Sequence, residues 1–590
     1  MKFRFFRHLL LLFILTSGII IGEVPAAKTR KPNIPYLGQS INFQTIEMKI
    51  FSPFTTGMFP DRYSDLILNP ASIMSNDTTS LYLDFNADNY ENPVLSPLVL
   101  NELYDTQTIS PRWYGYTTRS SVQTNPLYNF AALVPLSSTF SLAVFNRSLF
   151  DYGPFLSAQS YATGRGDELA MDYANMNIEP KRDEIDNNQQ SVKGNQSEVV
   201  LGMSIYPALD LGLRLGSYFF DRDGTLYDSK WANYNHSSFS DLNDEHLEIN
   251  GHHFECGIGA LYHISKKMDA GLYGRLIWGK ADENTGILDT SYTWSEQAGN
   301  TAYYSMLHPF LKSSDQYHSK IYIPRLALIY QWKIKENVLW RTGISYSSGK
   351  NDLTGANTSL DTTSSDRTYD QWISTDTYAF RRQEHEQIRK SSFSGKGQEK
   401  MNTIAFYSSL IYLPDEEWSL FSGIGFNRVY TTYHIDESSQ YYSNSIDIFS
   451  FYDPQTSGLL YKEKSIYNLD TERCEWNLII PVGMKTHIYK GLYLLIGTDI
   501  TLTMADENAN SRLFFPEKLT RRTEDSTVID EPDNDRLETY SSNPPKNFTR
   551  TVTNRFGLTY QHTSGFTVYL KSSGNIFTTG NWAFGFGLFL

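Results

Sequence analysis

The sequence contains little of what holds most exported or membrane proteins together. It has 2 cysteines in 590 residues, Cys256 and Cys474, too few for a disulfide framework. Beyond its N-terminus it has no apolar run of about 18 residues, so no further spanning helix is expected. It also has no excess of positive charge, because the formal net charge is -14, which argues against nucleic acid as a partner. For an exported chain, these absences leave secreted, periplasmic and β-barrel proteins as the classes to consider.

The N-terminus has the pattern of an export signal. Three basic residues, Lys2, Arg4 and Arg7, precede an apolar stretch over 9–21, and small residues follow at 24–26. A membrane anchor is the alternative, but this apolar stretch is short for a spanning helix. We therefore predict a cleaved signal peptide over residues 1–26.

The chain is rich in aromatic residues, and many of them lie in segments whose side chains alternate between large apolar and small or polar. Aromatics make up 14% of it, and the chain ends in "NWAFGFGLFL". Here the large apolar residues at even positions share one face of an extended strand, whereas Ala583, Gly585 and Gly587 share the other with Phe589. A terminal strand with one broad apolar face and one nearly bare face is typical of a barrel closed in lipid.

The same alternation recurs in hairpins along most of the chain. Short turns such as "YPALD" and "SKKMD" alternate with long polar stretches near 147–195, 220–252, 280–319, 348–401, 429–474 and 504–549. A soluble β-sandwich or propeller would also alternate, but its connections would not sort by length in this way. We therefore predict an all-β fold, a transmembrane antiparallel up-and-down β-barrel with long outer loops and short periplasmic turns.

The strand count follows from the even number that such barrels normally have. About 16 strands are expected, within a range of 14–18. The segment "RWYGYTTRS" (112–120) would break the even count and is assigned to the first outer loop. The sixteen predicted strands are 78–87, 126–135, 138–146, 196–206, 209–219, 253–264, 269–279, 320–332, 337–347, 402–413, 417–428, 475–488, 491–503, 550–562, 565–572 and 582–590.

Ionised residues mark the face of these strands that cannot point at hydrocarbon. They either form inner-wall ion pairs that hold the barrel together or line a path for a ligand, and both interpretations stay open. The predicted lumen residues are Glu198, Arg214, Glu255, Arg275, Arg325, Arg341, Lys485, Asp499 and Arg555.

Residues 27–77 do not alternate like the barrel strands, and they precede the predicted barrel domain at 78–590. They contain "LNPAS" (68–72), in which Asn69, Pro70 and Ala71 resemble the "NPA" motif near the start of FadL/TodX-type (PorV-like) outer-membrane transporters. The resemblance implies a hatch inside the barrel and hydrophobic ligands that cross by way of it. Alternatively, Asn69 and Pro70 only initiate a turn.

Three motifs resemble catalytic or metal-binding motifs but lack the sequence context that such sites require. "DRDGTL" (221–226) is similar to a phosphatase motif, yet it follows an alternating strand rather than a buried parallel one. His246, Glu248, His252, His253 and Glu255 fit no standard zinc spacing, and the acidic "DEPDNDRLE" (530–538) lacks the EF-hand glycine. We therefore predict no enzyme and no cofactor and assign no metal site, although a weak divalent site in the acidic loop stays open and sequence alone does not exclude a barrel-embedded hydrolase.

The favoured function is an outer-membrane channel or transporter for hydrophobic or small molecules. The alternative is a structural or interaction barrel whose surface serves binding, adhesion or secretion. The expected location is the outer membrane of a Gram-negative-type cell. The expected partners are outer-membrane lipid, hydrophobic small molecules and surface or secretion proteins, with no nucleic acid.

Overall fold

The chain divides into residues 1–32 and 33–590, and all residues described below belong to the second unit. The predicted signal peptide and the 112–120 segment lie outside the described residues. The computed structural model describes residues 43–51, 57–86, 128–153, 187–234, 237–297, 301–374, 377–415, 418–451, 453–524, 527–542, 546–573 and 582–589.

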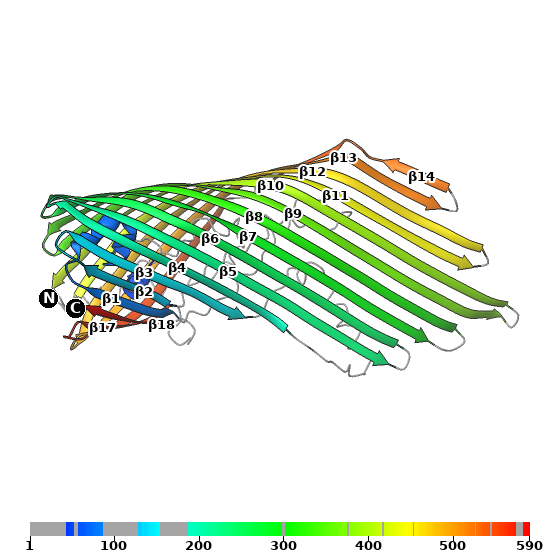
Figure 1. Cartoon of the computed structure of the whole chain (residues 1–590), viewed down its shortest axis with the longest axis horizontal. Coiled ribbons are helices and arrows are strands. Elements are labelled where there is room, and N and C mark those ends of the chain that lie inside the picture. Colours follow the sequence, from blue (N-terminus) through cyan, green and yellow to red (C-terminus); the bar gives the residue numbers. More distant parts are fainter. Residues whose placement is uncertain are drawn as a thin grey trace. The chain divides into compact units, whose positions relative to one another are not determined.

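One antiparallel sheet runs through the described strands and closes on itself (Figure 1). The closure lies at β1 (Ser80–Asn86), which pairs with β18 (Trp582–Phe589) on one side and β2 (Tyr128–Pro135) on the other. The strands between them are β3 (Phe140–Gly153), β4 (Asn187–Tyr206), β5 (Leu209–Tyr234), β6 (Ser237–Ser265), β7 (Met268–Gln297), β8 (Thr301–Lys335), β9 (Val338–Ser374), β10 (Thr377–Asp415), β11 (Trp418–Phe451), β12 (Asp453–Tyr489), β13 (Leu492–Glu524), β14 (Thr527–Pro532), β15 (Arg536–Ser542), β16 (Asn547–Gln561) and β17 (Phe566–Ser573).

The barrel has sixteen strand positions although the described residues form eighteen strands. β14, β15 and β16 all pair along the same edge of β13, at successive heights, and so share one position. Eighteen strands less two give the sixteen that were predicted. Each of the sixteen predicted segments overlaps a strand of the wall, so the predicted fold class is confirmed.

Burial separates the two faces of the wall as the alternation predicted. In β18, Ala583, Gly585 and Gly587 are buried, whereas the Phe584 side chain is 41% exposed. Outward apolar side chains form a band over 270–278, 322–332, 338–346 and 404–412 in β7 to β10. The length of this band along each strand matches the roughly 9–11 residues with which a β-strand crosses a bilayer. The chain is therefore an outer-membrane β-barrel.

The prediction of long outer loops is wrong for most of the stretches concerned. Residues 220–252, 280–319, 348–401 and 429–474 are almost entirely strand, and β10 alone has 39 residues. Beyond the apolar band the outward face also becomes mostly polar, so the period-two pattern of hydrophobicity disappears. The strands continue nevertheless, because each backbone still finds hydrogen-bond partners on its neighbours.

Among the described residues, three short helices precede the first strand: α2 (Ile46–Phe51), α3 (Ser64–Leu68) and η1 (Pro70–Ser75). Within the described residues no helix has the length and apolar character needed to cross a membrane. Their apolar side chains form one buried cluster with inward residues of the wall, including Tyr82, Phe145 and Leu495. The main core of the molecule therefore lies between this N-terminal segment and the inner face of the barrel.

Candidate functional site: the N-terminal segment and the charged inner wall

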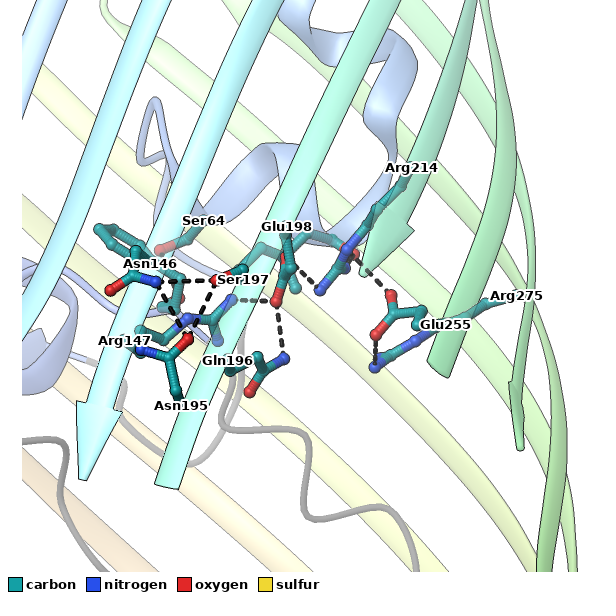
Figure 2. Close-up of polar contacts among 12 residues, drawn as sticks. Ser64, Asn146, Arg147, Asn195, Gln196, Ser197, Glu198, Arg214, Glu255 and Arg275 are labelled. Carbon is teal, nitrogen blue, oxygen red and sulfur yellow. Dashed lines mark hydrogen bonds and ion pairs between the residues drawn. The ribbon is translucent and has the colours of Figure 1, made fainter. Parts of the chain in front are cut away.

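Five buried charged residues form a continuous ion-pair chain across five neighbouring strands (Figure 2). Glu198 on β4 binds Arg147 of β3 and also Arg214 of β5, the latter at 2.7 Å. Glu255 on β6 binds Arg214 at 2.9 Å and Arg275 of β7 at 2.5 Å. The side chains of all five are at most 3% exposed. Each carboxylate is thus held between two guanidinium groups.

Four of these five residues were predicted from the sequence, and Arg147 was missed. It occupies an inward position one residue beyond the predicted end of its strand, since β3 continues to Gly153. The period-two alternation extended by one residue would have found it.

The other predicted lumen residues have separate partners. Asp499 pairs with Arg555 across β13 and β16. Arg325 donates to the Ser345 hydroxyl at 3.3 Å. Arg341 and Lys485 instead reach the N-terminal segment, where they bind Asp65 at 2.8 Å and Glu47 at 2.9 Å.

The N-terminal segment is attached to the wall through the predicted motif. The Asn69 side chain accepts from the Ala71 amide at 3.1 Å and so caps η1, which begins at Pro70. Its amide nitrogen also donates to the Ala260 carbonyl of β6 at 2.9 Å. The motif therefore does initiate a turn, and in addition it binds that turn to the barrel.

Glycines of the wall leave room for this turn. A Cβ on Gly212 would lie 2.2 Å from the Pro70 carbonyl carbon, and one on Gly259 would lie 2.0 Å from Asn69 Oδ1. Gly202, Gly212 and Gly259 are direct cross-strand partners on β4, β5 and β6. The three glycines thus form a bare strip on the inner wall against which η1 lies.

Further contacts hold α2, α3 and the stretch around Met58 to different parts of the wall. The backbone amide of Ile46 in α2 donates to the Tyr82 hydroxyl of β1 at 2.8 Å. Arg214 of the charged chain donates to the Ile67 carbonyl of α3 at 3.2 Å. Ser409 of β10 donates to the Met58 carbonyl at 2.6 Å. The segment is therefore anchored around much of the barrel circumference.

Burial changes the ionisation of this segment. It raises the pKa of the Asp65 carboxyl, and the Arg341 guanidinium opposes that shift. It likewise raises the pKa of Asp61, against hydrogen bonds from Ser64 and Thr45, and it raises the pKa of Tyr63 to about 12. Loss of the Arg341 contact would therefore favour a neutral Asp65.

The residues considered for metal binding do not come together. In β6, His246, Glu248 and His252 lie on one face of the strand, whereas His253 and Glu255 lie on the other. Residues 221–226 are part of β5, not of an α/β domain. Asp530 and Asp533 in the acidic hairpin bind Arg521 and Arg536. Among the described residues, no group of three or more metal-ligating side chains is present.

Arg214→Leu should lower the free energy of unfolding more than Leu213→Arg, which places a charge against lipid at the adjacent position. Leu213→Arg exposes a charge to hydrocarbon, at about 2–4 kcal/mol near the bilayer midplane. Arg214→Leu leaves both Glu198 and Glu255 short of a partner, and breaking a buried pair costs about 3–5 kcal/mol. Reversible unfolding in vesicles measures both. Arg325→Leu is the control and should be milder, because its bond goes to a hydroxyl. Equal losses for Arg214→Leu and Arg325→Leu would show that the ion-pair chain does not stabilise the wall.

Comparison with known proteins yields similarities of structure only. No protein-family model and no curated protein matches the chain. A FadL homologue of Pseudomonas aeruginosa is similar at a TM-score of 0.28 and 10% identity, over 90% of this chain and 95% of that one. The Ralstonia pickettii toluene transporter TbuX gives 0.27 and 7%, over 68% and 98%. The Pseudomonas putida toluene transporter TodX gives 0.23 and 8%, over 82% and 98%.

Proposed function

We propose that the protein is an outer-membrane channel for hydrophobic or small molecules, with the N-terminal segment as a hatch in its lumen. The observation that carries this proposal is the way in which the segment is held. The wall closes without it, because β1 pairs with β18 and β2 directly. The segment is therefore not needed to complete the sheet, yet it is bound to the inner wall by Arg341, Lys485 and the glycine strip.

Two apolar clusters on the inner wall offer contacts for an apolar passenger. Above the charged chain, β7 and β8 present the buried cluster of Ile277, Ile321 and Ile323. A second buried apolar cluster lies farther along β9 to β13 and consists of Leu353, Ile435, Tyr467, Leu469, Leu513 and Phe515. A hydrophobic molecule would find contacts in both places, whereas an ion would lose its hydration there.

Uptake by proteoliposomes tests the proposal. Vesicles with the purified full-length protein should take up a labelled long-chain fatty acid faster than empty vesicles, and a labelled monosaccharide should enter no faster than the fatty acid. The same protein in planar bilayers should show a small conductance, because the hatch occupies the lumen. Uptake equal to that of empty vesicles for both probes would refute the channel.

One observation favours a surface-binding function as the second candidate. Strands β5 to β13 continue well beyond the apolar band and carry polar residues on their outward face. Such a surface suits a protein partner. Binding of the protein to a defined surface partner, together with the absence of uptake, would favour this alternative.

A further inference from the structure

The outer edge of the apolar band is marked by aromatic side chains. Trp278 on β7, Tyr322 on β8 and Tyr346 on β9 point outward and are 41%, 51% and 49% exposed. Trp278 and Tyr322 are direct cross-strand partners. Rings of this kind lie at the level of lipid headgroups in outer-membrane barrels. The residues that follow on the outward face therefore meet the outer surface of the bilayer.

A belt of four exposed lysines lies immediately beyond these rings. Its members are Lys280, Lys320, Lys350 and Lys400, one on each of β7 to β10, and we call them the lysine belt. Lys280 is the direct cross-strand partner of Lys320, and Lys350 of Lys400. Figure 1 shows these four strands side by side.

Like charges in directly opposite positions are unfavourable, because their Cβ atoms are about 4.5–5.5 Å apart. Among the described residues, Asp352 is the acidic side chain that binds the belt: it pairs with Lys350 at 2.8 Å, it lies directly across from Lys320, and it also accepts from Gln398. Four lysines less one aspartate leave three positive charges. Asp282 is engaged by His318 at 2.6 Å. The belt thus contains two adjacent like-charge pairs, and the acidic side chains around it are too few to neutralise them.

At the height of the belt, the positive charge is confined to these strands. The row through Lys350 and Lys400 continues as Thr432, Glu472 and Asn508 on β11 to β13. In the other direction, the row through Lys280 continues as His252 and Phe219. In a chain with a formal net charge of -14, this local excess of lysine indicates an anionic ligand outside the protein.

We propose that the lysine belt binds the phosphate groups of the anionic glycolipid that forms the outer leaflet of the outer membrane. The acyl chains of that lipid lie against the apolar band of β7 to β10. Its phosphates lie at the height of the belt, between the paired ammonium groups. The flexible lysine stems cover the rings below and place their charge at the headgroup level. This inference does not depend on the channel function.

Native mass spectrometry of the detergent-purified protein, titrated with diphosphorylated lipid A, tests the proposal. Lys280→Gln/Lys320→Gln should weaken lipid A binding about 30-fold, at about 1 kcal/mol for each lysine near the surface. The matched control is Lys390→Gln/Lys396→Gln, which removes two exposed lysines from the outward face of β10 above the belt. It should leave the affinity unchanged.

Two further measurements separate this result from misfolding and from a free-anion site. Without lipid A, the belt variant should be at least as resistant to heat as the wild type, because a repulsive pair has been removed. Inorganic phosphate should not compete with lipid A, and zwitterionic phosphatidylethanolamine should bind more weakly. Equal weakening in both double variants, unchanged binding in the belt variant, or full competition by inorganic phosphate would each overturn the proposal.

Discussion

Gly212→Leu is expected to raise the conductance of the barrel by displacing the turn at Asn69. The new side chain starts 2.2 Å from the Pro70 backbone, so η1 must leave the glycine strip or the strand must bend. Overpacking of this kind costs about 1–3 kcal/mol. Barrels of 16–18 strands have room for an aqueous channel when nothing fills them. Single-channel recording in planar bilayers should therefore show larger and more frequent openings than the wild type.

Gly274→Leu is the matched control for this change. Gly274 lies on β7, and a Cβ there would meet nothing within 4 Å. The same substitution at this position should leave conductance and heat-modifiable migration unchanged. If Gly212→Leu assembles and conducts like the wild type, the N-terminal segment does not control the lumen.

The sequence predicted the strands well where the bilayer imposes a contrast between the two faces. Leu209, Leu211, Leu213 and Leu215 alternate with inward residues because one side of β5 meets lipid and the other does not. The outer half of β10 has no such contrast, and residues such as Ser392, Ser394 and Lys396 gave no period-two pattern. β10 continues there because β9 and β11 provide hydrogen-bond partners for its backbone. A local sequence pattern does not reveal such partners.

The same contrast between local patterns and contacts across strands explains how much of the candidate site could be predicted from the sequence. The inward charges could be found one at a time, because hydrocarbon excludes them from the other face. Their pairing could not, since Arg214 meets Glu198, Glu255 and Ile67 only through the register of three strands and the fold of the N-terminal segment. Gly202, Gly212 and Gly259 are small residues at inward positions of alternating strands. Only the cross-strand register shows that they form one strip beneath η1.

Removal of the last ten residues, 581–590, is expected to abolish assembly of the barrel. β18 is the partner of both β17 and β1, and it provides the only described link between them. Without it, two strands within the apolar band lose a row of backbone partners. Each unsatisfied backbone group in hydrocarbon costs several kcal/mol. Heat-modifiable, membrane-embedded protein should therefore fall to background on mild-detergent gels of outer-membrane fractions.

Deletion of residues 519–532 is the matched control for this truncation. It also removes strand residues, namely the upper end of β13 and all of β14, but these lie beyond the apolar band and β14 is exposed throughout. The ends to be joined are already adjacent, because the Asp533 amide donates to the Lys518 carbonyl at 2.9 Å. This variant should assemble like the wild type.

Two substitutions within β18 test its inward and outward faces separately. Gly585→Trp should reduce assembly, because a Cβ at this position already lies 2.9 Å from Ile46 of α2 and from Asp84 of β1. Leu588→Phe, on the outward face, should be nearly silent, since it replaces one apolar side chain by another against lipid. If the 581–590 truncation assembles as efficiently as the 519–532 deletion, then β18 does not close the wall. The pairing of β1 with β18, on which the sixteen-position barrel rests, would then be wrong.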